Sequence, residues 1–451
     1  MSADNHAMNR ANIVFMHSHN TGRFVQPYGH AVPTPCLQRL AGQGVLFRQA
    51  FAAAPTCSPS RASFLTGMYP HSCGQLGLAH RGFGMPDYSR HLVHGMKRAG
   101  YHTVLSGVEH TAPDLAVVGY DEVVCGHDTN YPETEPADAA DAAAAFIRGR
   151  HSKTFFISVG LNETHRPFPP ADPEHHPAED ERYCRPPAPL PDTPATRRDT
   201  ADFKAAARVM DAAFARVLRA LDDAGLADDT LVLCFTDHGL QFPRNMCNLT
   251  DQGIGVFLVA RGPGGFRGGR VIDALVSLID LAPTAYAAAG IDIPDFVQGR
   301  PLQPLARGEV DALHEEIHAE INFHAAYEPA RCVRTARHKY IRRYDDYERV
   351  VLSNADDGPS KEELLSQGWA ELPREREMLY DLTFDPAEQH NIVARGDVRR
   401  VADDLRRRLD RWMEATGDPL LTGSVDAPAG ARVTDAMARS PADRSRTRTT
   451  G

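Results

Sequence analysis

Five short, mostly apolar runs most strongly limit what this chain can fold into. They cover residues 12–16, 101–107, 154–161, 230–236 and 255–260. Runs of this length without polar alternation are typical of strands buried on both faces of a parallel sheet. Helical patterns separate them, including an Ala-rich stretch at 138–150 and apolar residues at helical spacing between 199 and 225. The alternation predicts an α/β fold in which helices sandwich one large, mainly parallel sheet.

Polar side chains follow four of these runs at the point where each predicted strand ends. Open α/β sheets place their ligand sites at the carboxyl ends of strands, so these side chains are expected to converge. They are His19, Asn20, His110, His165, Asp237 and His238. Imidazole, amide and carboxylate groups are common metal ligands. A turn without metal is the alternative for His19 and Asn20, and a structural histidine is the alternative for His110.

A cysteine stands at a predicted helix start in residues 55–67, which read Pro-Thr-Cys-Ser-Pro-Ser-Arg-Ala-Ser-Phe-Leu-Thr-Gly. Ser58 is the expected N-cap and Pro59 suits the first helical position, which places Cys57 just before the helix. Free N–H groups there favour negative charge. Arg61, in the first turn, is able to grip a tetrahedral oxyanion through two hydrogen bonds. The run therefore predicts an anion site that contains a nucleophile.

Length and charge exclude several classes of protein. A chain of 451 residues predicts a large domain and a smaller one. The net charge of −10 argues against nucleic acid or an anionic membrane as the main partner. The N-terminus lacks the apolar stretch of a signal peptide and no segment approaches a membrane span, so we expect a cytoplasmic protein. The eight cysteines lack metal-finger spacing, which favours reduced thiols.

The run Cys57-Ser58-Pro59-Ser60-Arg61, with Leu65-Thr66-Gly67, resembles the signature of the sulfatase family, in the alkaline phosphatase superfamily. The resemblance extends from residue 12 to about residue 421 and is nearest to the sulfamidase-like branch (N-sulfoglucosamine sulfohydrolase) and related bacterial sulfatases. It implies a catalytic α/β domain at 1–310 and a smaller α+β C-terminal subdomain at 311–423. Residues 424–451, rich in Ala, Arg, Ser and Thr, predict a disordered tail.

The resemblance also implies a chemistry. In the family, a formylglycine-generating enzyme oxidises the signature cysteine, here Cys57, and the hydrated aldehyde attacks the sulfur of a small anionic substrate. One divalent metal is implied, with its ligands drawn from His19, Asn20, Cys57, Asp237 and His238. Calcium is expected by resemblance, but His19 and Asn20 stand where most sulfatases have two aspartates, which also admits Mn²⁺ or Zn²⁺.

By the same resemblance, Cys57, Arg61, His110 and His165 are the expected catalytic residues, and Arg166 and Arg244 are candidate substrate-binding residues. Arg166 is equally well explained as a surface charge.

Val108 and Met246 stand where the family carries basic residues that contact the sulfate. Each lost contact would cost about 2–4 kcal/mol of transition-state binding. The predicted function is hydrolysis of a sulfate ester or sulfamate. The alternatives are a phosphate or phosphonate ester hydrolase on the same frame, or a non-catalytic sulfatase-like binding protein with unmodified Cys57.

Overall fold

The computed structural model describes residues 10–126, 136–173 and 177–451. Its large sheet has eight strands in the order β4-β3-β5-β1-β6-β7-β2-β8. The bounds are β1 (Asn12–Ser18), β2 (Val45–Phe51), β3 (His102–Gly107), β4 (Glu122–Gly126), β5 (Phe155–Gly160), β6 (Thr230–Thr236), β7 (Leu258–Arg261) and β8 (Arg270–Ser277). All neighbouring strands are parallel except where β7 pairs with β6 and β2. The predicted mainly parallel sheet is confirmed; β2, β4 and β8 are additions to the five predicted strands.

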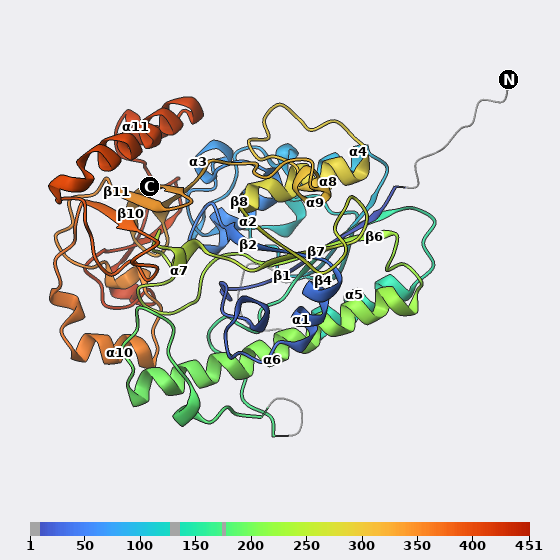
Figure 1. The fold of residues 1–451 in the computed structure, drawn as a ribbon, viewed down its shortest axis with the longest axis horizontal. Coiled ribbons are helices and arrows are strands. Elements are labelled where there is room, and N and C mark those ends of the chain that lie inside the picture. The colour runs from blue at the N-terminus through green and yellow to red at the C-terminus, as the bar shows by residue number, and fades with distance from the viewer. Residues whose placement is uncertain (1–9, 127–135, 174–176) are drawn as a thin grey trace.

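Helices cover both faces of this sheet (Figure 1). One face carries α1 (Pro35–Gln43), α5 (Pro136–Arg148) and α6 (Pro194–Asp223), whose apolar sides pack on the strands through residues such as Phe214 and Val217. The other face carries α2 (Cys57–Thr66), α4 (Leu92–Arg98), α8 (Leu281–Ala289) and α9 (Gln303–Arg307). There Phe64 of α2 meets Phe235 of β6 edge-on, with ring centroids 4.8 Å apart. Among the described residues, no helix combines the length and apolarity that a membrane span requires.

A smaller antiparallel sheet forms the C-terminal subdomain, with strand order β12-β11-β10-β9. Its strands are β9 (Glu316–Phe323), β10 (Tyr327–Thr335), β11 (His338–Arg343) and β12 (Glu377–Asp381). One face packs on the long helix α11 (Arg399–Thr416), where Leu409 and Trp412 join Tyr340. The other face packs against the large domain, where Ile317 and Ile341 meet Met246. Three short helices, α3 (Pro70–Cys73), α7 (Asp251–Ile254) and α10 (Pro359–Ser366), are also present.

The tail at 424–451, predicted to be disordered, instead carries the hairpin of β13 (Arg432–Thr434) and β14 (Thr447–Thr449). Ala431 and Val433 are buried in a cluster with Phe83. The guanidinium of Arg81 donates hydrogen bonds to the carbonyl oxygens of Arg432 (3.3 Å) and Pro441 (2.7 Å). Composition predicted disorder because it counts polar residues, whereas the small apolar residues here alternate along the chain and pack inward.

Candidate active site

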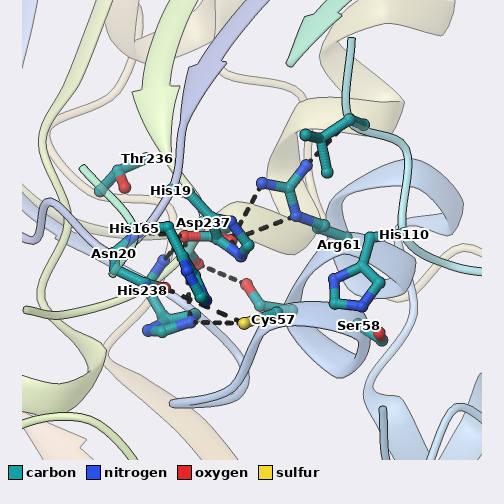
Figure 2. A network of polar contacts seen from close by, with 12 residues as sticks. His19, Asn20, Cys57, Ser58, Arg61, His110, His165, Thr236, Asp237 and His238 are labelled. Carbon is teal, nitrogen blue, oxygen red and sulfur yellow. Dashed lines mark hydrogen bonds and ion pairs between the residues drawn. The ribbon is translucent and has the colours of Figure 1, made fainter. Parts of the chain in front are cut away.

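The carboxyl ends of β3, β5, β1 and β6 lie side by side at one edge of the large sheet. The structure brings together, around one centre, the polar side chains that follow these strands (Figure 2). They are His19 and Asn20 after β1, His110 after β3, His165 after β5, and Asp237 and His238 after β6. Cys57 at the start of α2 faces the same centre. Each of four residues offers one potential metal-ligand atom, and these atoms lie within 4.8 Å of one another. The residues are His19, Cys57, Asp237 and His238.

The helix that carries the cysteine begins at Cys57 rather than at Pro59. Thr56 has extended backbone and is the N-cap residue. The Ser58 hydroxyl accepts a hydrogen bond from the backbone N–H of Ala79 (2.9 Å). The prediction that Ser58 caps the helix is therefore wrong, because a neighbouring segment uses its side chain.

The thiol of Cys57 is directed into the cluster. Its Sγ lies 3.4 Å from Nε2 of His238 and 3.9 Å from Oδ1 of Asn20. The side chain is almost completely buried. Burial and the nearby Asp237 carboxylate raise the pKa of the Cys57 thiol well above its usual value, so the unmodified thiol is protonated at neutral pH.

The guanidinium of Arg61 is fully buried and bonded to protein groups. Nε and Nη2 each lie 3.1 Å from Oδ2 of Asp237. Nη1 donates to Nδ1 of His17 (3.2 Å) and to the carbonyl oxygen of Val108 (3.1 Å). These contacts commit Arg61 to holding Asp237 in place, instead of leaving it open to grip an oxyanion.

Asp237 is the only carboxylate among the four residues of the cluster, and both of its oxygens are engaged. Oδ1 accepts hydrogen bonds from the backbone N–H groups of Asn20 and His238, both at 2.9 Å. Oδ2 lies 3.0 Å from Nε2 of His19, and both side chains are fully buried. The carboxylate is thereby fixed in one orientation.

The second ring nitrogen of each cluster histidine is also held. Nδ1 of His19 lies 3.2 Å from the side-chain oxygen of Asn162, and Nδ1 of His238 lies 3.1 Å from the carbonyl oxygen of Gly239. The carbonyl oxygen of Gly239 is an acceptor, so Nδ1 of His238 carries the hydrogen in the neutral ring and Nε2 faces the cluster with its lone pair. His19 has an acceptor at each ring nitrogen, because its Nε2 lies 3.0 Å from Oδ2 of Asp237.

His165 and His110 lie beside the cluster rather than within it. The ring centroid of His165 is 4.7 Å from that of His19, and the ring of His110 is 6.1 Å from it. Burial lowers the pKa of His165 to about 4 and that of His110 well below its usual value. Nε2 of His110 also lies 2.9 Å from Nδ1 of His80. Both rings are neutral near pH 7.

Four further residues of the site escaped the sequence analysis. Gln241 accepts a hydrogen bond from Nδ2 of Asn20 (2.8 Å) and donates one to Asp356. His324 interacts electrostatically with Asp356, and burial lowers the pKa of His324 to about 4. Gln241 and His80 stand in segments that already carried a signal, three residues after His238 and in the Gly- and His-rich stretch 71–80. His324 and Asp356 come from the C-terminal subdomain and have no local signal.

Arg166 lies at the edge of the site. Its Nη2 pairs with Asp199 at 2.7 Å, and its Nε donates to the carbonyl oxygen of Gln241 (3.1 Å). The guanidinium also lies over the rings of Phe168 and Phe242. Together with His165 it lines a cavity of about 770 Å³. Its charge is therefore largely compensated, although it borders the space next to a site histidine.

Arg244 is not brought into the site. Its Nη2 lies 3.2 Å from Oε1 of Gln389, and it lines a separate cavity of about 220 Å³ that Met246 also lines. Met246 packs in an apolar cluster between the two sheets. The contacts of Arg244 therefore give no support to its expected role as a substrate-binding residue.

Comparison with known proteins fits this arrangement. A family model described as Sulfatase matches residues 12–291, which is more than half of the chain. The chain belongs to the sulfatase family. A second model, described as N-sulphoglucosamine sulphohydrolase, C-terminal, matches residues 237–367 of this sulfatase.

Several named proteins are similar to this sulfatase over most of its length. It is 28% identical to human N-sulphoglucosamine sulphohydrolase, over 86% of this chain and 87% of the relative. It is 26% identical to an ulvan-active sulfatase from Formosa agariphila, over 91% of this chain and 76% of the relative. A solved structure of a protein in complex with its substrate D-glucosamine-2-N,6-O-disulfate matches the fold with a TM-score of 0.71 at 18% identity, over 91% of this chain and 98% of that one.

Proposed function

We propose that this sulfatase hydrolyses a sulfate ester or sulfamate of a small, sugar-like anionic substrate, with a formylglycine derived from Cys57 as nucleophile. One observation carries the proposal. Cys57 stands in an unbroken signature run at the first residue of a ten-residue helix, with its side chain directed at the group of metal-type donors. The N-terminus of such a helix favours an anion at this position. A formylglycine-generating enzyme is the partner that maturation requires.

The residues present fit a divalent metal. His19, Asp237 and His238 offer one donor atom each, and Asn20 adds an amide oxygen 3.9 Å from Cys57 Sγ. When bound, such a metal would lower the pKa of the nucleophile's oxygen and screen the charge of the substrate. Arg61 acts on the metal site indirectly, because it holds the Asp237 carboxylate in place.

His165 and His110 are the groups placed to move protons. They lie on two sides of His19, and both are neutral near pH 7. A neutral imidazole accepts a proton from the nucleophile and passes it to the leaving oxygen or nitrogen.

The substrate's anion meets fewer cations here than in a typical sulfatase. Val108 and Met246 provide no charge, and Arg61 and Arg166 are each paired with a carboxylate. A bound metal and neutral donors would therefore supply most of the contacts to the sulfate. A singly sulfated substrate suits this site better than a highly sulfated polymer, since Arg61 and Arg166 are already paired with carboxylates.

Sulfate release from defined substrates tests the proposal. The full chain, co-produced with a formylglycine-generating enzyme, is assayed on N-sulfoglucosamine, glucosamine 6-sulfate, and the sulfate and phosphate esters of p-nitrophenol. We expect sulfate release that Cys57→Ala abolishes and that His165→Ala lowers by about 10²–10⁴-fold. His390→Ala, an exposed histidine, is the matched control and retains full activity.

The outcomes separate the alternatives. Phosphate release without sulfate release would replace the proposal with the phosphate ester hydrolase. If protein that carries the aldehyde turns over none of these substrates, the remaining hypothesis is a non-catalytic binding protein. Sulfate release that survives Cys57→Ala would show that Cys57 is not the nucleophile.

A further inference from the structure

We propose that the cluster of His19, Asp237, His238 and position 57 selects a nitrogen- and sulfur-preferring metal of the Zn²⁺ class over calcium. His19 Nε2, the Asp237 carboxylate and His238 Nε2 are the ligands from the unmodified chain, and the side chain at position 57 is the fourth. This metal is the one that the proposed function requires, so the inference rests on that function. Metal binding itself requires no hydrolytic step and can be measured separately.

Calcium does not fit this donor set. Ca²⁺ takes six to eight oxygen ligands, mostly carboxylates and carbonyls. The cluster offers one carboxylate, from Asp237, and the amide oxygen of Asn20. Arg61 already places a positive charge 3.1 Å from Oδ2 of that carboxylate, so the pair has no net charge. The Asp237 carboxylate and one amide oxygen supply too few oxygens for the coordination shell that Ca²⁺ takes.

The donors suit a tetrahedral Zn²⁺ site in type, and three of their spacings lie within a few tenths of an ångström of it. Zinc binds imidazole nitrogen, thiolate sulfur and carboxylate oxygen through bonds of about 2.0–2.3 Å. Donors on such a tetrahedron lie about 3.3–3.7 Å apart, by the geometry of those bond lengths. Here Cys57 Sγ and His238 Nε2 are 3.4 Å apart, His19 Nε2 and Asp237 Oδ2 are 3.0 Å apart, and His238 Nε2 and Asp237 Oδ1 are 3.9 Å apart.

The surroundings of both histidines are those of metal ligands. A ligating histidine usually donates its other N–H to a carbonyl or carboxylate, which fixes the tautomer and the ring orientation. His238 does so to Gly239, and Nδ1 of His19 lies 3.2 Å from the side-chain oxygen of Asn162, which is able to accept in the same way. Nε2 of His19 and Oδ2 of Asp237 lie 3.0 Å apart, which places both atoms within reach of one metal ion.

Titration of the untagged full chain with single metals tests the inference. The protein is stripped with a chelator and titrated by calorimetry with Zn²⁺ and, separately, with Ca²⁺. We expect one Zn²⁺ per chain and an affinity for Zn²⁺ at least about 100-fold above that for Ca²⁺. His19→Gln and His238→Gln are expected to lower Zn²⁺ affinity by at least about 100-fold, a loss above the range seen for removal of outer-shell partners. His390→Ala, the exposed control, keeps it.

Cobalt substitution keeps the inference testable if a ligand variant does not fold. Co²⁺ in the unmodified wild-type chain is expected to show tetrahedral visible bands and a sulfur-to-metal charge-transfer band, and Cys57→Ser removes only the latter. Calcium affinity equal to or above that for Zn²⁺ would overturn the inference, as would Zn²⁺ binding unaffected in both glutamine variants, or cobalt spectra of octahedral form.

The two proposals fail separately. A protein without aldehyde or turnover that still binds Zn²⁺ through His19 and His238 refutes the proposed function and retains this inference. An active sulfatase that prefers Ca²⁺ does the opposite.

Discussion

Two buried clusters in this molecule combine imidazole, carboxylate and guanidinium groups, yet they differ in what they offer a ligand. The site cluster joins His19, Asp237 and Arg61. The second joins His71, Glu320, Asp418 and Arg331 between the large domain and the C-terminal subdomain, and its ligand-type atoms also lie within 4.8 Å of one another. Both clusters therefore bring ligand-type atoms close together. They differ in the balance between their charged groups and their neutral donor atoms.

In the second cluster, both carboxylates contact donor groups of neighbouring residues. Arg331 Nη2 lies 3.0 Å from Asp418 Oδ1, and Glu320 accepts hydrogen bonds from the backbone N–H of His71 (2.9 Å) and from Nδ2 of Asn322 (3.1 Å). Its two carboxylates face a guanidinium and an imidazole. In the site cluster, the Arg61 guanidinium pairs with the only carboxylate of the four residues, Asp237. The imidazoles of His19 and His238 and the thiol of Cys57 are directed at the same centre. The two clusters therefore differ in their balance of groups: two carboxylates meet one guanidinium and one imidazole in the second cluster, whereas two imidazoles and a thiol outnumber the single carboxylate in the site cluster.

The largest expected effect is on the second cluster. Arg331→Met leaves two buried carboxylates without their cation, and breaking a buried pair in this way costs about 3–5 kcal/mol of unfolding free energy. Urea denaturation measures the loss. Zn²⁺ affinity per folded molecule is expected to stay unchanged. A stable variant with altered metal binding would mean that the two clusters are not distinct in kind.

Another buried carboxyl, outside both clusters, tests whether such a group stays neutral when no cation is paired with it. Glu163, next to Asn162, is buried and neither of its oxygens has a hydrogen-bond partner among the described residues. Burial raises the pKa of Glu163 from 4.5 to about 7. The folded state thus binds more protons than the unfolded state between these values, and stability falls as pH rises through that window.

Glu163→Gln removes this dependence, because the amide does not ionise. Relative to the wild type, the variant should gain about 3 kcal/mol of unfolding free energy as pH rises from 4.5 to 8, by the linkage of pKa to stability. Urea melts at several pH values measure the difference. Parallel pH profiles for the two proteins would show that the Glu163 carboxyl is ionised in the folded state throughout.

Two asparagines offer a matched pair that sharpens the comparison. Asn162 accepts from His19 in the site cluster, and Asn322 bonds Glu320 in the second. Asn162→Ala should lower Zn²⁺ affinity by about 10–100-fold, the usual effect of losing an outer-shell partner, whereas Asn322→Ala should leave it unchanged. Calorimetric titration distinguishes them. Equal losses in both variants would point to a general loosening of the fold.

The smallest effect is expected where the same kind of pair is exposed. Arg337 lies 2.7 Å from Asp381 at the surface, where water screens the charges. Arg337→Ala should shift the urea midpoint too little to resolve. A clear destabilisation would show that pairing itself, rather than burial, sets the cost of losing Arg331.

The sequence predicted most of the large sheet and the main site residues, because their signals are local. Runs such as 230–236 are buried on both faces, and Asp237 and His238 follow directly. The Cys57 run was also recognised from the sequence. The N-cap at Thr56 was not, because the Ser58 hydroxyl, expected to cap the helix, instead accepts a hydrogen bond from Ala79 of a separate segment.

The remaining features depend on contacts between segments far apart in the chain. His324 and Asp356 reach the site only when the C-terminal subdomain packs on the large domain, and neither stands in a motif. The role of Arg61 changed for the same reason: its partner, Asp237, lies 176 positions away. The tail was misread because burial of Ala431 and Val433 requires Phe83 and its neighbours.

The most direct test of the central claim, that Cys57 is the source of the nucleophile, is a mass spectrum of the tryptic peptide Gln49–Arg61 from protein purified from its native host. The account predicts the aldehyde, in which an oxygen replaces the elements of H₂S at Cys57. A peptide found wholly as the unmodified thiol would contradict it and leave a metal-binding protein without the proposed hydrolytic chemistry.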